Sequence, residues 1–233
     1  GWDKAAQAVV PQMVYQLGLD PAKVRWIAAA HRHQTHENNP HLHLLFWEEG
    51  APTRKTAQWS DAERRAIRRV WVSELYRPER QQVGQAKTAA RTEARATLVD
   101  LLARRHQAQG FHRELAQRLR ALGRQLPGHG RLAYAYLPAA VKRDTEALIR
   151  WLWTTDPGLK AAHDRFVAAA EQMGLFYWHT DPAKTQDAAG REAALARLRA
   201  QAEADLLQRL AGPALKAAPA DHTPSSSQRP ADL

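Results

Sequence analysis

The chain has 233 residues, which is enough for one or two small domains, and it contains no cysteine. Disulfides and thiolate metal sites are therefore excluded. Its 34 lysines and arginines exceed its 24 aspartates and glutamates, giving a formal net charge of +10. This excess favours polyanionic partners such as DNA, although free use of arginine in a GC-rich genome would also produce it. The sequence contains neither a signal peptide nor an apolar run of roughly 18 residues, so we expect a bacterial cytoplasmic protein without a membrane partner.

The N-terminal part predicts a helix followed by two strands. Residues 3–18 show helical spacing of apolar side chains, although Pro11 should kink that helix. Strands are predicted at 23–33 and 41–48, joined by a polar loop. Two strands do not form a stable sheet alone, and the chain opens at Gly1 within a helical pattern. We therefore expect further strands upstream, in a sequence that is incomplete at its N-terminus.

The remainder of the chain predicts helices. Ser60 and Glu63 form a capping box for a helix that ends before Pro78. A long polar helix is expected from about 79 to 123, with interruptions at its glycines, and further helices at 138–153, 156–173 and 183–211. The fold class predicted is α+β, a small antiparallel sheet followed by a mostly helical region. The expected boundaries delimit an α/β domain at 1–57, an arginine-rich helical region at 58–125, a C-terminal helical region at 126–211 and a disordered tail at 212–233.

Five of the eleven histidines lie between positions 31 and 43. His41 and His43 alternate with leucines in a predicted strand, which places both imidazoles on one face, and His31 and His33 have the same spacing. Two adjacent strands of this kind can surround one cation with three imidazoles, which suit transition metals. A site with three histidines leaves positions open for substrate, as catalytic sites do. A packed or adventitious histidine tract is the alternative, and His36, in the loop, is expected to be solvent-exposed.

The segment WIAAAHRHQTHENNPHLHLLFWEE resembles the metal motif of MobL-type relaxases, which belong to the HUH endonucleases, with His41-Leu42-His43 as its histidine-hydrophobe-histidine core. A second segment, LPGHGRLAYAYLPAAVKRDTEALIRWLW, resembles the helical region that follows in that family. Together the similar regions cover about residues 14–50 and 126–173. The loop between the histidine pairs is longer than in the family pattern, so the third ligand is either His31 or His33, with His33 slightly favoured by its shorter distance to His41.

The resemblance implies a metal-dependent DNA nickase and strand transferase that acts at an origin of transfer in plasmid or integrative-element mobilisation. It implies a divalent ion (Mn, Mg or Zn) held by His41, His43 and the third histidine, with origin DNA and other relaxosome proteins as partners. Glu37 and Glu48 are candidate acid–base or supporting groups. Relaxases attack DNA with a tyrosine upstream of the metal motif. Tyr15 alone lies upstream, in a helical stretch where packing is the more common role, so no convincing nucleophile is identified.

Arginines are concentrated in residues 77–124, either as a solvated surface or as contacts to DNA phosphates. Arg91, Arg95, Arg104 and Arg105 are the candidate DNA-binding residues. The strand tryptophans Trp26 and Trp47 are expected in the core. Two other functions stay open. A replication initiator or transposase of the same superfamily would use a tyrosine downstream of the histidines, and a non-catalytic basic DNA-binding accessory protein would need none.

Overall fold

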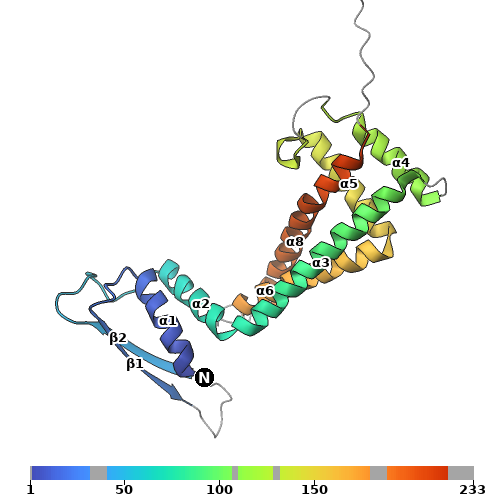
Figure 1. Cartoon of the computed structure of the whole chain (residues 1–233). Coiled ribbons are helices and arrows are strands. Elements are labelled where there is room, and N and C mark those ends of the chain that lie inside the picture. The colour runs from blue at the N-terminus through green and yellow to red at the C-terminus, as the bar shows by residue number, and fades with distance from the viewer. Residues whose placement is uncertain (1, 32–40, 107–109, 128–131, 179–187, 220–233) are drawn as a thin grey trace, which may run out of the picture. The chain divides into compact units, whose positions relative to one another are not determined.

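The N-terminal part of the chain forms a β-hairpin that follows one helix and precedes another in the sequence (Figure 1). The structure is a computed structural model that describes residues 2–31, 41–106, 110–127, 132–178 and 188–219. Helix α1 spans Trp2–Gln16, strands β1 and β2 span Val24–His31 and His41–Glu48, and helix α2 spans Asp61–Leu75. The predicted helix and both predicted strands are thus present.

The two strands pair antiparallel, with Val24 opposite Glu48 at one end and His31 opposite His41 at the other. The backbone N–H of Glu49 donates to the carbonyl oxygen of Lys23 at 2.8 Å. Hydrogen-bonded and non-hydrogen-bonded pairs alternate along an antiparallel ladder. This bond therefore fixes which residues of β2 turn their backbone groups toward β1: they are the odd-numbered ones.

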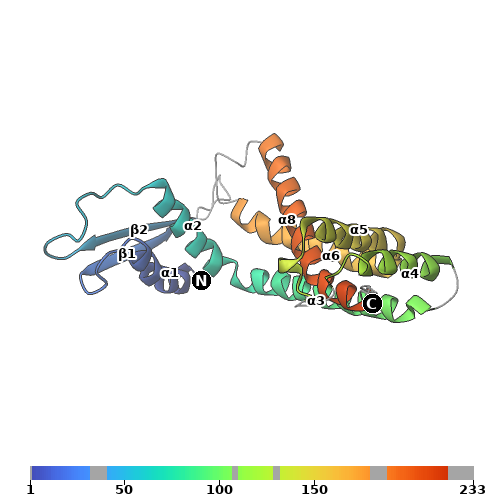
Figure 2. The same cartoon turned by 90° about the horizontal axis from the view of Figure 1, so that it is seen from above.

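One face of the hairpin is covered by α1 and α2. Val9 and Met13 from α1 and Ile67 from α2 form a buried cluster against which Leu44 and Phe46 of β2 pack. Figures 1 and 2 show both helices beside the hairpin. This burial supports α1 as an unbroken helix through Pro11, the residue expected to kink it.

The rest of the chain is helical, and local sequence signals mark several helix ends. Pro78 lies in the first turn of its helix, where a missing N–H costs nothing. The carboxylate of Asp156 accepts the backbone N–H of Leu159 at 2.7 Å and so caps the helix that begins at Pro157. The elements are α3 Arg77–Ala103, the 3₁₀ turn η1 Arg104–His106, α4 Gly110–Gly123, the 3₁₀ turn η2 Tyr134–Tyr136, α5 Ala139–Thr155, α6 Pro157–Trp178 and α8 Ala188–Ala217.

The capping box predicted at the start of α2 is confirmed. The Ser60 hydroxyl oxygen accepts the backbone N–H of Glu63 at 3.3 Å, and the Glu63 carboxylate accepts the backbone N–H of Ser60 at 2.7 Å. The hydrogen bond from the Ser60 backbone is the main cause that lowers the pKa of Glu63 below its ordinary value.

Replacing Ser60 by alanine is expected to lower the free energy of unfolding by about 1 kcal/mol, because the backbone N–H of Glu63 loses its hydroxyl acceptor and the Glu63 carboxylate loses the hydrogen bond from that hydroxyl. The hydrogen bonds to the ionised Glu63 carboxylate stabilise the fold at pH values above the pKa that this group has in the unfolded chain. This stabilisation is lost as the pH falls through the lower pKa that Glu63 has in the folded protein. Chemical denaturation at neutral and acidic pH measures both effects. Ser73→Ala, within the same helix, is the control and should change stability little. Equal losses in both variants would contradict the cap.

The chain divides into two compact units, and their limits differ from the expected boundaries at 57, 125 and 211. The first unit holds residues 1–82 and 173–191, and the second holds 83–172 and 192–233. One physical reason is that segments on both sides of residue 125 share one core, so no boundary falls there. That core includes the fully buried side chains Leu98, Leu152, Phe166 and Leu206.

The tail expected to be disordered from residue 212 is instead helical in its first part. Helix α8 passes through Pro213 to Ala217, and Leu215 is fully buried. Pro219 approaches Gly123 so closely that a Cβ on Gly123 would lie 2.0 Å from the Pro219 carbonyl oxygen. The apolar contacts of residues 214–218 with the helical core offset the hydrogen bond that proline cannot donate.

Candidate metal-binding face of the hairpin

The residues of β2 alternate between an exposed and a half-buried face. His41, His43 and Leu45 are exposed, whereas Leu42 and Leu44 are half-buried on the side of α1 and α2. Period-two alternation in a strand produces this separation. The sequence prediction that both imidazoles share one face, with the leucines on the other, is therefore confirmed.

The two imidazoles lie close together. Their ring centroids are 5.0 Å apart and the ring planes meet at 72°. Metal–nitrogen bonds are about 2.1 Å long, so rings at this separation can each direct one nitrogen to a shared cation. The donor set fits a transition metal, since neutral imidazole is a preferred ligand for such ions.

The strand register brings a third histidine to the same end of the hairpin. His31 pairs with His41 across the two strands, and Ala29 pairs with His43. His33 and Glu37 lie outside the described residues. In the part of the chain that the structure describes, no group of three metal-binding side chains is assembled. The backbone thus places His31, and not Ala29, opposite the end of β2 that carries the histidines.

Glu48 lies away from the histidine pair. It is at the opposite end of β2 from His41, about 23 Å along an extended strand, and on the half-buried face. Its carboxylate accepts hydrogen bonds from the backbone N–H of Thr53 at 2.9 Å and from the Thr53 hydroxyl. The bond from that hydroxyl is the main cause that lowers the pKa of Glu48. The structure gives this residue a role in holding the turn after β2.

Tyr15 also lies apart from the histidine pair. It is 80% exposed on α1, while its neighbour Val14 is buried against the hairpin. Helix α1 covers the face of the sheet opposite to His41 and His43. The packing role favoured for Tyr15 is not observed, because Tyr15 lies on the outer side of α1. The same position separates its hydroxyl from the exposed face of the hairpin that carries His41 and His43, called the histidine face below.

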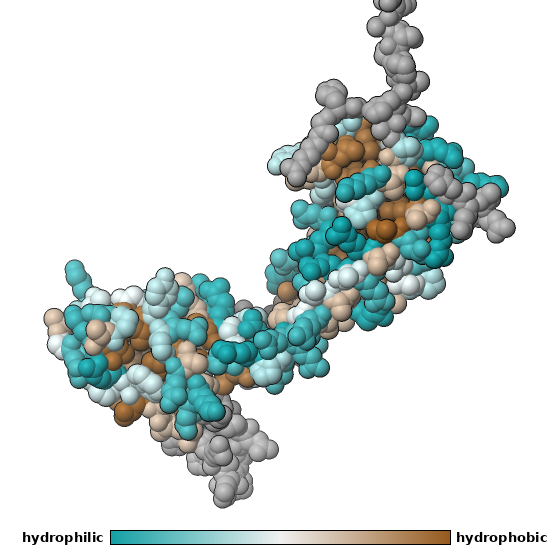
Figure 3. All heavy atoms as spheres, viewed as in Figure 1, coloured by the Kyte–Doolittle hydropathy of each residue, from teal (hydrophilic) through white to brown (hydrophobic). Residues whose placement is uncertain are grey.

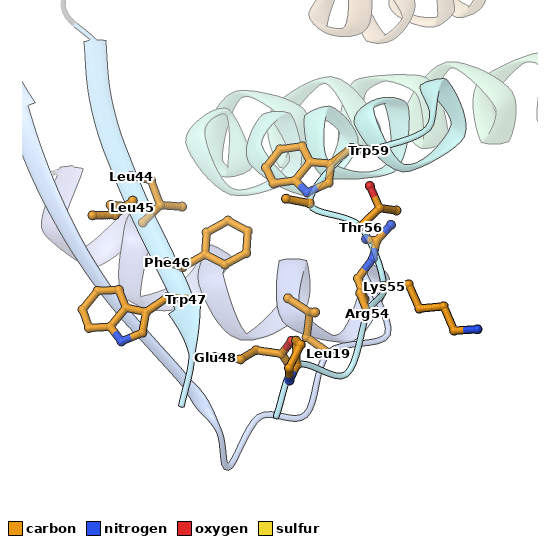
Figure 4. A pocket seen from close by; sticks show the side chains of 12 residues that line it. Leu19, Leu44, Leu45, Phe46, Trp47, Glu48, Arg54, Lys55, Thr56 and Trp59 are labelled. Carbon is orange, nitrogen blue, oxygen red and sulfur yellow. The ribbon is translucent and has the colours of Figure 1, made fainter. Parts of the chain in front are cut away.

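An apolar surface continues the histidine face along the hairpin. Leu45 is 60% exposed, and Trp47 and Ile27 share its face. The expectation that Trp47 belongs to the core is wrong, because its odd position in β2 turns it away from α1. Figure 4 shows Trp47 and Phe46 pointing to opposite sides of the strand. Sequence alternation alone could have identified Trp47 as part of this face.

A cavity of about 410 Å³ lies on the other side of β2, under the segment that follows the strand. Phe46 stacks on Trp59 inside it, with ring centroids 5.7 Å apart (Figure 4). Arg54 lines the cavity and pairs with Glu63 at 3.0 Å. These contacts hold the segment against β2 and leave the histidine face uncovered by it.

The four arginines predicted to bind DNA differ in their surroundings. Arg104 pairs with Asp100, and the Arg105 guanidinium donates to the carbonyl oxygen of Leu102 at 2.8 Å. Arg95 is exposed and Arg91 is half-exposed. Arg95 and Arg105 line one groove of the helical unit, whereas Arg91 and Arg104 do not.

Comparison with known proteins identifies no relative: no family model, curated protein or solved structure matches the chain. None of the described helices is long and apolar enough to cross a membrane. The activity of the chain must therefore be inferred from the chemistry of its own residues. Figure 3 colours the described surface by hydropathy: hydrophilic side chains cover most of the face shown, and apolar side chains form smaller patches between them.

Proposed function

We propose that this chain is the metal-binding part of a DNA nickase and strand transferase of the relaxase type, acting at an origin of transfer. The observation that carries the proposal is the pair His41 and His43, side by side on the exposed face of a strand, with His31 opposite His41 in the register. An exposed imidazole pair is accessible to a large substrate such as a DNA strand.

His41 and His43 would hold the divalent ion, with His31 or His33 as the third ligand. A bound divalent ion supplies a Lewis acid that polarises a phosphoryl oxygen. The register supports His31 over the slightly favoured His33, because His31 is paired directly with His41. Leu45 and Trp47 extend this face and offer an apolar surface on which sugars and bases of a single strand can lie.

A non-catalytic DNA-binding accessory protein is the second candidate, and the position of Tyr15 favours it. Attack on phosphorus requires the nucleophilic oxygen within about 3–3.5 Å and in line with the scissile bond. Tyr15 lies on the outer side of α1, across the sheet from the imidazoles. The accessory candidate therefore predicts that this chain binds metal and DNA but does not cut DNA.

Incubation of a single-stranded oligonucleotide library with the chain and Mn²⁺ tests the two candidates. The nickase function predicts Mn²⁺-dependent cleavage, with any covalent protein–DNA adduct visible on a denaturing gel, and loss of both in His41→Ala/His43→Ala. Binding that falls steeply with salt, without cleavage under any metal condition, supports the accessory protein instead. Binding that does not change between low and moderate salt would remove the nucleic-acid function altogether.

A further inference from the structure

A basic groove lies in the helical unit between α3 and α8, and no feature of the histidine site accounts for it. The groove encloses about 480 Å³. Arg95 and Arg105 line it from the side of α3 and η1, and Arg209 and Lys216 line it from α8. Among the described residues that line the groove, none is an aspartate or glutamate. All four basic residues belong to the same compact unit, so the groove is defined within one body.

The four cations retain capacity for a ligand. The Arg209 Nε atom donates to the carboxylate of Asp205 at 2.8 Å, which leaves its two terminal amino groups available. Arg105 uses one of its terminal nitrogens on a backbone carbonyl. Arg95 and Lys216 are exposed and pair with no carboxylate among the described residues. The groove therefore concentrates positive charge that this unit neutralises only in part.

The spacing of the cations favours an extended ligand over a compact one. Arg95 and Arg105 are ten residues apart, or roughly 15 Å along a helix, and Arg209 and Lys216 are about 10 Å apart. A single phosphate cannot contact charges spread over these lengths. A chain of phosphates can, and arginine forks match phosphate oxygens in pairs.

The floor of the groove is aliphatic. Val99, which is 48% exposed, lies beside Leu102, Ala103 and Pro213 between the basic walls. An apolar floor between two basic walls suits a ligand with negative charges along its edges and less polar groups between them. The sugars and bases of a single-stranded nucleic acid have that arrangement, with phosphates on the outside.

We propose that the groove between α3 and α8 binds single-stranded DNA through its phosphates, as a contact separate from the histidine face. The inference shares with the proposed function the premise that the chain binds DNA, and it does not depend on the metal or on cleavage. Acidic peptides and anionic membranes are the competing ligands for a basic groove with an aliphatic floor.

Gly212 allows the groove to be blocked without changing its charge. This glycine lines the groove within α8, and a Cβ placed on it meets no atom within 4 Å. Gly212→Leu therefore adds bulk in open space and should preserve the helix, since leucine is the better helix former. If the groove binds DNA, this variant loses affinity although all four cations remain.

Charge reversal at Arg95 and Lys216 tests the walls. The slope of log affinity against log salt concentration falls in magnitude by about 0.7 for each phosphate contact that a single strand loses. The double variant Arg95→Glu/Lys216→Glu should therefore lose about 1.4 in this slope, and it should bind more than roughly tenfold more weakly at moderate salt. The matched control is Arg120→Glu/Arg143→Glu, which reverses two exposed arginines of the same unit outside the groove.

The experiment measures fluorescence anisotropy of a labelled oligo(dT) of about 20 nucleotides against the full chain and these variants, without metal. Weaker binding in the groove variants than in the control, with unchanged circular dichroism, supports the proposal. Equal binding in all variants overturns it while leaving the nickase function standing. If the wild-type chain binds DNA through the groove but does not cut DNA in the Mn²⁺ incubation described above, only the nickase function is overturned. Polyglutamate or anionic phosphatidylglycerol vesicles that displace oligo(dT) at equal charge concentration overturn the nucleic-acid assignment.

Discussion

Replacing His41 and His43 together by alanine is expected to abolish stoichiometric Mn²⁺ binding to this chain. The two rings lie 5.0 Å apart on one strand face, so both contribute nitrogen ligands to the same proposed site. Loss of a residue that merely supports a ligand commonly costs 10–100-fold in metal affinity, and loss of the ligands themselves should cost more. Isothermal titration calorimetry with Mn²⁺ and with Zn²⁺ measures the effect directly.

Single variants then separate the possible third ligands. His31→Ala should weaken binding strongly if the register pairing with His41 selects the ligand, whereas His33→Ala should do so if the loop selects it. His112→Ala is the matched control, because this histidine lies on α4 in the other unit. Unchanged metal binding in the His41/His43 double variant would remove the proposed site.

Replacing Leu206 by alanine is expected to lower the free energy of unfolding of the helical unit by about 3 kcal/mol. Leu206 is fully buried in a cluster that joins α3, α4, α5, α6 and α8. Its truncation loses the transfer free energy of the removed carbons and leaves a cavity that rigid neighbouring helices fill only in part. Urea denaturation followed by circular dichroism reports the change.

Val99→Ala is the control for this prediction, because Val99 is a branched aliphatic residue of the same unit with an exposed side chain. Its effect should stay within about 0.5 kcal/mol. A similar loss of stability in both variants would show that the cluster does not form the core of the unit. The chain has two compact units, which can unfold in separate transitions. Leu206→Ala should therefore shift the same transition that other substitutions in this core shift.

Features set by neighbouring residues were the most predictable from the sequence. The cap at Ser60 and the helix start at Pro157 need only side chains within three positions of the helix end. The strand from His41 to Glu48 follows from its alternation of apolar side chains and histidines. The resulting fold class, a small antiparallel sheet followed by helices, is confirmed on the same basis.

Features set by distant contacts were not predictable in this way. Helix α8 continues beyond Gly212 because its last residues pack on other helices, which local composition does not reveal. Trp47 was missed for a different reason: the alternation along β2 places it on the exposed face, but its size and apolar character suggested burial. The third histidine depends on which residue of β1 pairs with His41, and residue spacing left both His31 and His33 open.

The alternation of hydrogen bonds in the hairpin has a consequence for how its sheet can grow. Since the odd residues of β2 bond to β1, the N–H and C=O groups of Leu42, Leu44 and Phe46 point outward along the far edge of β2. The side chains of these three residues, together with residues of α1 and α2, line a cavity of about 460 Å³ that His41 also lines. An extended segment pairing there would place every second side chain beside His41 and His43. The histidine face can thus be widened by one strand without moving either imidazole.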